Sequence, residues 1–129
     1  GILAATALPR FVDLSTDARV AAVNGLAGSI RSAASIARAT QLAKGYSAAF
    51  PISLDGTSIA MSGGYPTAGG ISMALTDFSG FTINTAAGTS IVDFRLNNRS
   101  DCKVRYTEPT TSPGPFTVTV TSTGGTDPC

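Results

Sequence analysis

The chain has 129 residues and a formal net charge of +1, with nine Lys and Arg against eight Asp and Glu. This length suits one domain with a single hydrophobic core. Only 13% of the residues are charged, so the chain lacks the basic field with which proteins neutralise phosphate groups. We therefore expect no nucleic-acid partner, and the 43% of hydrophobic residues argues against a disordered chain.

Side chains with catalytic or metal-binding chemistry are scarce. His is absent, and Glu108 is the single glutamate. Without His there is no Ser-His or Cys-His nucleophile pair and no imidazole metal site. Three aspartates, Asp93, Asp101 and Asp127, do not have the spacing of an EF-hand calcium loop. The composition predicts that the chain is not an enzyme and uses no cofactor or metal.

In chain order, the first predicted element is a long helix within residues 1–44. No second proline follows Pro9 before Ala43, and Gly45 is the expected stop. Pro9 either starts this helix or bends a longer one. Apolar residues recur at spacings of three and four and form one stripe, whereas Arg19, Arg31 and Arg38 fall outside it. The stripe consists of Val20, Val23, Ala27, Ile30, Ala34 and Ala37.

The predicted helix is longer than the rest of the domain is wide. About 35 residues at 1.5 Å per residue extend about 50 Å, so we expect the first part, with the apolar stretch Gly1–Leu8, to project. Gly25 and Gly28 each cost such a helix about 1 kcal/mol relative to alanine. They are either simply tolerated, or they permit close approach of another helix or strand.

Residues 45–80 read as a segment that connects helix to sheet. Asp55-Gly56 predicts a turn, as do the glycine pairs at 63–64 and 69–70. We expect a short strand around 58–62 and a short helix over 71–78. This makes the segment mainly a loop.

Residues 81–129 have the alternation of β-strands. Segments 81–83 and 92–96 predict a hairpin, and segments 103–106 and 116–121 predict two further strands. Thr117, Thr119 and Thr121 would line one face of the last strand. The expected architecture is a single α+β domain, in which the helix stripe covers an antiparallel sheet of about four strands.

The two cysteines, Cys102 and Cys129, predict a staple that holds the C-terminal segment in an oxidising compartment. The closed loop of about 27 residues would contribute roughly 3.5 kcal/mol in the chain-entropy model. The alternative is a pair of buried free thiols in a cytosolic protein.

Several of these residues together carry a family resemblance. The stretch Gly1–Phe11 resembles the part of a type IV pilin just beyond its membrane-inserting segment. Asp17-Ala18-Arg19, the Tyr-Pro loop at 64–68, and Cys102 followed by Val104, Tyr106 and Thr107 before a second cysteine resemble the mannose-sensitive haemagglutinin (MSHA) type of major pilin. The resemblance covers essentially the whole chain.

The resemblance implies a type IV pilin fold and a structural role. The chain would be the major subunit of an extracellular pilus on a bacterial surface, serving attachment, biofilm formation and twitching motility. Its partners would be other copies of itself, minor pilins, the pilus assembly machinery and, before assembly, the inner membrane. A disulfide between Cys102 and Cys129 would close the C-terminal loop. The assembly helix would include Gly1, Ile2, Leu3, Leu8, Pro9 and Phe11.

One departure from the pilin pattern concerns the N-terminus. The family's cleavage site, its N-terminal Phe and the nearby Glu do not precede Gly1, so we expect a truncated or incompletely represented subunit. The alternative function is a pseudopilin of a type II secretion system. A third hypothesis is a ligand-binding module that uses the Thr-rich strand face.

Overall fold

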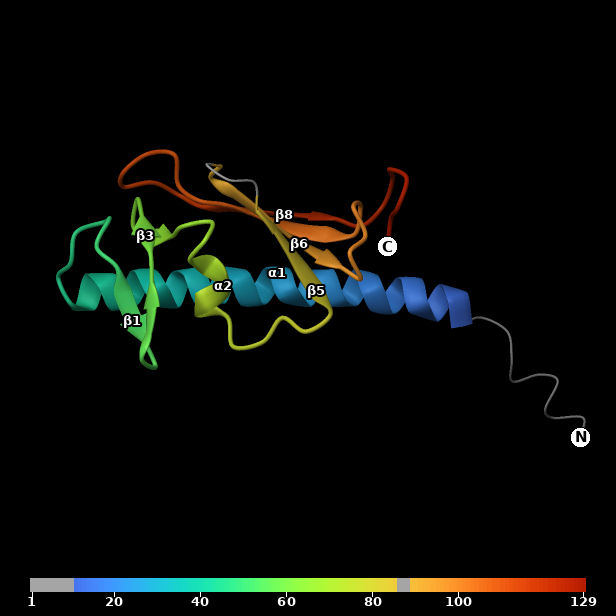
Figure 1. The fold of residues 1–129 in the computed structure, drawn as a ribbon, viewed down its shortest axis with the longest axis horizontal. Helices are drawn as coiled ribbons and strands as arrows, with labels where there is room; N and C mark the ends of the chain where they lie inside the picture. The colour runs from blue at the N-terminus through green and yellow to red at the C-terminus, as the bar shows by residue number, and fades with distance from the viewer. Residues whose placement is uncertain (1–10, 86–88) are drawn as a thin grey trace, which may run out of the picture.

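The computed structural model describes residues 11–85 and 89–129, and side chains of the first helix from residue 16 onward. One long helix lies along a four-stranded antiparallel sheet of strand order β5-β6-β7-β8 (Figure 1). The elements in chain order are α1 (Phe11–Ala43), β1 (Ile52–Leu54), β2 (Thr57–Ile59), β3 (Met61–Ser62), β4 (Tyr65–Pro66), α2 (Ile71–Ala74), β5 (Phe81–Thr85), β6 (Ile91–Leu96), β7 (Lys103–Thr107) and β8 (Thr117–Thr121).

The long helix is confirmed over the 33 residues of α1, about 50 Å at 1.5 Å per residue. It ends at Ala43, just before the predicted stop at Gly45, whose φ of 68° places it in the left-handed region. The amides of Gly45 and Tyr46 donate to the carbonyls of Leu42 and Gln41, which satisfies two otherwise free carbonyls at the helix end. The first turns of α1 extend past the sheet (Figure 1), so the described helix does project.

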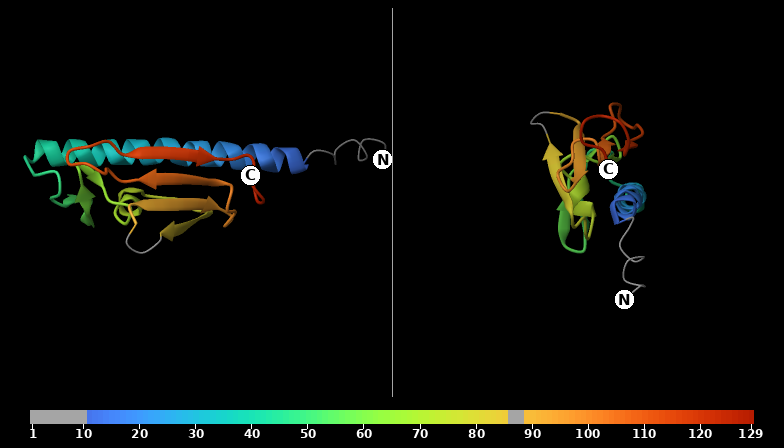
Figure 2. Two further views of the ribbon diagram at one scale, coloured as in Figure 1. Left: turned by 90° about the horizontal axis from the view of Figure 1, so that it is seen from above. Right: turned by 90° about the vertical axis from the view of Figure 1, so that its right-hand side faces the viewer.

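The apolar stripe of α1 packs on the sheet, as its spacing predicts. Val23, Ala27, Ile30 and Ala34 are buried against Val92, Phe94, Val104 and Tyr106 of β6 and β7 in one core cluster. A second cluster, towards the C-terminal end of α1, joins Ala37 to Ile52, Ile59 and Met61. Figure 2 shows the helix as one layer and residues 46–85 and 89–129, called the head below, as the other.

The register of the sheet separates two faces. Val92, Phe94, Val104 and Tyr106 point towards α1 and are fully buried. The residues between them in β6 and β7 therefore point to the outer face, because successive side chains of a strand alternate. The threonine row of β8 is confirmed, since Thr117 and Thr119 are exposed whereas Val118 and Val120 pack against the core.

The prediction for residues 45–80 was too simple. Two small hairpins form here, β1–β2 and β3–β4, rather than a loop with one short strand. Asp55 and Gly56 both have positive φ, the mirror-image turn that joins strands tightly. The predicted helix over 71–78 is also too long, because α2 ends at Ala74 and Leu75 is extended with a ψ of 136°. Further on, Asp77 accepts hydrogen bonds from the amide and hydroxyl of Ser79, and this local turn replaces helical bonds.

Among the described residues, no helix or strand approaches Gly25 or Gly28 closely. A Cβ added at either glycine would meet no heavy atom of this part of the chain within 4 Å, so close packing within it does not require glycine at these two positions. Both line an open groove of about 610 Å³ between α1 and residues 74–77.

We expect the Gly25→Ala and Gly28→Ala variants to raise the free energy of unfolding by about 0.5–1 kcal/mol each. Both sites are helical and exposed, and alanine restricts the unfolded chain more than glycine does. Urea denaturation measures the change. A loss of stability in either variant would show that the added methyl group is not accommodated.

Gly63→Ala serves as the opposite control. Gly63 has a φ of 62°, and an added Cβ would lie 2.6 Å from both the Pro109 Cβ and the Thr111 carbonyl oxygen. This variant should be destabilised, because the backbone conformation and the space both disfavour a side chain.

Candidate functional site

The C-terminal segment, residues 122–129, is held against the helix and the sheet by a disulfide. Cys102, just before β7, is bonded to Cys129, with Cα atoms 4.7 Å apart. Both cysteines are buried and belong to the main core cluster. The staple is thus confirmed, and the alternative of two free thiols is wrong.

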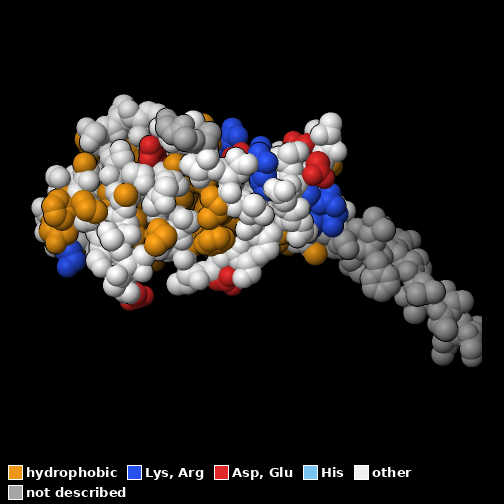
Figure 3. All heavy atoms as spheres, viewed as in Figure 1, with side chains coloured by type: hydrophobic (Ala, Val, Ile, Leu, Met, Phe, Trp, Pro, Cys, Tyr) orange, Lys and Arg blue, Asp and Glu red, His pale blue; other side chains and the backbone are white. Residues whose placement is uncertain are grey.

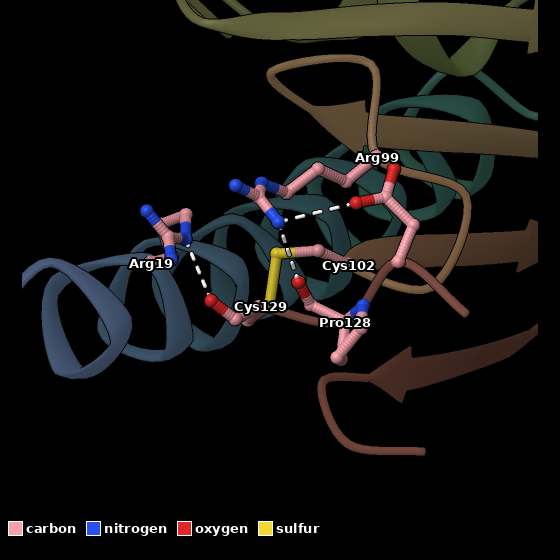
Figure 4. Close-up of a disulfide and its surroundings, with 6 residues drawn as sticks. Arg19, Arg99, Cys102, Pro128 and Cys129 are labelled. Carbon is pink, nitrogen blue, oxygen red and sulfur yellow. Dashed lines mark hydrogen bonds and ion pairs between the residues drawn. A yellow bond between two sulfur atoms is a disulfide. The ribbon is translucent and has the colours of Figure 1, made fainter. Parts of the chain in front are cut away.

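Two arginines fix the last residues of this segment (Figure 4). The Nε atom of Arg19 on α1 donates to the carbonyl oxygen of Cys129 over 2.7 Å. Arg99, in the turn before Cys102, donates to the Asp127 carboxylate over 3.1 Å and to the Pro128 carbonyl over 3.0 Å. The segment is therefore tied to both layers of the fold.

Asp101 organises the backbone of the same segment. Its Oδ2 atom accepts hydrogen bonds from the amides of Thr126 and Asp127 over 2.8 and 2.9 Å. These bonds to the charged form, led by the Asp127 amide, lower the pKa of Asp101. Gly125 passes so close that an added Cβ would lie 2.2 Å from the Asp101 carboxylate, and only glycine leaves room there.

The Tyr-Pro loop lies at the junction of helix, sheet and the 108–116 loop. The buried Tyr106 hydroxyl donates to the Pro66 carbonyl over 2.5 Å, and its burial raises its pKa. The amide of Ala68 donates to the Glu108 carboxylate over 2.9 Å. The Tyr65 ring meets Phe116 edge-on, with ring centroids 4.8 Å apart. The motif thus serves packing within the chain.

A charged group occupies the outer face of the sheet. Asp93 on β6 accepts two hydrogen bonds from Arg105 on β7, over 2.7 and 2.9 Å, and Lys103 lies 3.5 Å from the same carboxylate. The Asp93 side chain is only 7% exposed because these cationic side chains cover it. Burial alone would raise the pKa of Asp93, but the hydrogen bonds and charge of Arg105, helped by Lys103, lower it.

This pairing predicts acid sensitivity. Because the folded-state pKa of Asp93 lies below the unfolded one, its stabilising effect is complete above the unfolded pKa. The effect is lost as pH falls through the folded pKa. Asp93→Asn should lower the free energy of unfolding at pH 7 by about 1.5–3 kcal/mol and flatten its decline below about pH 5. Urea denaturation at several pH values measures both effects.

Asp17→Asn is the matched control, since Asp17 is exposed on α1 and the change removes the same charge. Its stability profile should follow that of the unmodified chain. A D93N profile as steep as that of the D17N variant would contradict the role assigned to Asp93.

The structure brings together only part of the predicted site. Cys102 and Cys129 meet, whereas Gly1, Ile2, Leu3, Leu8 and Pro9 of the predicted assembly helix lie outside the described residues. Phe11 begins α1, and only its backbone is described. Asp93 lies on the outer sheet face, apart from Asp101 and Asp127 in the C-terminal segment. Residues 11–85 and 89–129 contain no group of three or more His, Cys, Asp or Glu placed to hold a metal.

The polar contacts of the C-terminal segment could not be predicted from the sequence. Arg19, Arg99 and Asp101 lie 110, 29 and 25 residues from the groups that they bind. No local pattern in the sequence marks such contacts. Arg19 lies within the Asp-Ala-Arg motif that contributes to the pilin resemblance. This motif was the one feature of the sequence that drew attention to any of these three residues.

Comparison of the chain with protein-family models, with curated proteins and with solved structures finds no match. In the described part of the chain, no helix combines the length and apolar character needed to cross a membrane.

Proposed function

We propose that this chain is the major subunit of a type IV pilus, which assembles through its N-terminal helix into extracellular filaments for surface attachment and biofilm formation. Before assembly it would reside at the inner membrane. Other copies of the chain, minor pilins and the assembly machinery would be its partners.

The observation that carries this proposal is the distribution of charge on α1. From Ala18 to Ala43 the helix has three charged residues, and each contacts the head. Arg19 donates to Cys129, Arg31 reaches the Val118 carbonyl over 3.4 Å, and the Arg38 guanidinium lies over the Tyr65 ring, 5.9 Å from its centroid. None of these three arginine side chains therefore lies on the side of the helix that faces away from the head.

That opposite side, the free face of α1, is exposed and made mainly of small residues. An ordinary surface helix presents charged side chains to water. A face of small uncharged residues instead permits close approach of neighbouring helices, as in a filament core. The residues of this face are Ala18, Ala21, Asn24, Gly25, Gly28, Ser29, Ser32, Ser35, Ile36 and Ala39.

The disulfide favours a pilin over a pseudopilin. In the families that the sequence resembles, major pilins close the C-terminal region with a disulfide, whereas major pseudopilins usually hold it with Ca²⁺. The Cys102–Cys129 bond fits the former pattern.

Immunogold electron microscopy of intact cells, with an antibody against the head, tests the proposal. We expect gold along the whole length of surface filaments. Gold only at filament tips would make the chain a minor pilin. Gold seen only after permeabilisation would favour the pseudopilin and overturn the attachment function.

A charge placed on the free face of α1 tests the assembly mode. Ser32→Glu should abolish filaments while the isolated chain keeps its stability, because Ser32 is exposed on α1. Thr117→Glu, an exposed site on β8, adds the same charge and should leave filaments intact. Normal filaments from the S32E variant would contradict assembly through this face.

A further inference from the structure

The outer face of the four-stranded sheet carries two rows of polar and charged side chains, called the polar grid below, that no described element covers. Strand register places Asn84, Asp93, Arg105 and Thr119 side by side in one row. Arg95 and Lys103 are neighbours in the next row. Figure 3 shows Lys and Arg side chains gathered over this sheet and the C-terminal segment. The grid lies on the side of the head away from α1.

The charges of this grid do not balance. Three cations, Arg95, Lys103 and Arg105, face one carboxylate, Asp93. Arg105 engages both oxygens of that carboxylate, and Lys103 approaches one of them. Arg95 forms no ion pair with a described residue, so its positive charge is uncompensated there.

Arg95 also has an unused hydrogen-bond donor. Its Nε atom is buried and has no acceptor among the described residues. Buried donors are nearly always satisfied in native proteins, and an exception indicates an unseen water or ion. The Arg95 side chain also lines a surface pocket, and a guanidinium there is suited to a charge-assisted, bidentate bond with an oxyanion.

A pocket of about 260 Å³ lies at this position. Its size is just below the range of drug-sized ligand pockets, which suits a small group or a single sugar ring. Asn84 supplies an amide for hydroxyl groups, and Ile91 supplies an apolar surface. The lining residues are Asn84, Thr89, Ile91, Asp93, Arg95 and Arg105.

We infer that this pocket binds the carboxylate of an acidic sugar, with the Arg95 guanidinium as its anchor. One uncompensated cation matches one carboxylate, whereas a nucleic-acid strand needs a track of cations along its phosphates. The neighbouring strand β8 offers only Thr117, Thr119 and Thr121 on this face. The Asp93 carboxylate orients Arg105 and excludes a second anion. The site belongs to the head and does not depend on filament assembly.

Titration of the ¹⁵N-labelled 129-residue chain with glucuronate, followed by NMR, tests the inference. We expect a shift of the Arg95 Nε–H resonance with an apparent Kd of about 1 mM, typical of a single sugar with one ion pair. Glucose should cause no such shift. The absence of any Arg95 shift at about 10 mM glucuronate, or an equal shift with glucose, would overturn the site.

Variants assign the effect to Arg95. Arg95→Gln should weaken glucuronate binding at least about tenfold, because it removes the charge and the Nε donor. Arg31→Gln removes the same charge from α1 and should leave the Kd unchanged. If the R95Q variant does not fold, Arg95→Lys takes its place, since it keeps the charge and loses the guanidinium fork. Unchanged binding by the folded Arg95 variant would contradict the inference.

Titration with inorganic sulfate tests whether the pocket recognises the sugar ring or only the negative charge. Glucuronate should bind more tightly than sulfate, because Asn84 and Ile91 contact the ring. Sulfate binding as tight as that of glucuronate would overturn the assignment to an acidic sugar. All these measurements use the unassembled chain, so their outcome is separate from that of the immunogold experiment.

Discussion

Removal of the Cys102–Cys129 disulfide should lower the free energy of unfolding by about 3.5 kcal/mol, estimated from the entropy of a loop of this length. The bond spans 27 residues and joins Cys102, just before β7, to Cys129 in the C-terminal segment. Because the bond restricts the unfolded chain, its loss destabilises the fold even where native contacts persist. The double variant Cys102→Ala, Cys129→Ala and the oxidised chain should be compared in urea.

The reduced form of the unmodified chain is the matched control. It retains both cysteines, so its stability should fall by a similar amount. Reduction should also raise the intact mass by about two hydrogens, and thiol labelling of the unfolded, unreduced chain should be negative. A stability loss under about 1 kcal/mol, or a positive label, would contradict the staple.

Ile30→Ala should lower the free energy of unfolding by about 2–5 kcal/mol, the usual range for truncating a buried isoleucine. Ile30 is fully buried in the stripe where α1 packs on the sheet. Its truncation leaves a cavity at the interface that joins the two layers of the fold. Urea denaturation at pH 7 measures the loss.

Ile36→Ala is the control on the same helix, with the same atoms removed. Ile36 is 57% exposed on the free face, so its truncation should change stability by no more than about 0.5 kcal/mol. Equal losses of unfolding free energy in the Ile30→Ala and Ile36→Ala variants would contradict the packing of α1 on the sheet through the predicted stripe.

The pattern of single elements could be predicted from the sequence. Spacings of three and four identified the stripe of α1, and alternation identified β5 to β8, because side-chain direction repeats with the backbone geometry of each element. Predictions failed where elements are shortest. The hairpins β1–β2 and β3–β4 have two or three residues per strand, too few for a period to show.

By itself, the sequence determined the long helix, its buried stripe and the four strands, whereas it left the two cysteines either paired or free. Only the tertiary structure decided that Arg19 holds Cys129, that Asp93 faces Arg105, and that the buried Arg95 Nε–H has no acceptor among the described residues. The physical reason is that periodicity reports the surroundings of neighbouring residues along one element. Contacts between distant residues depend instead on strand register and on how the helix lies across the sheet, which no single segment specifies.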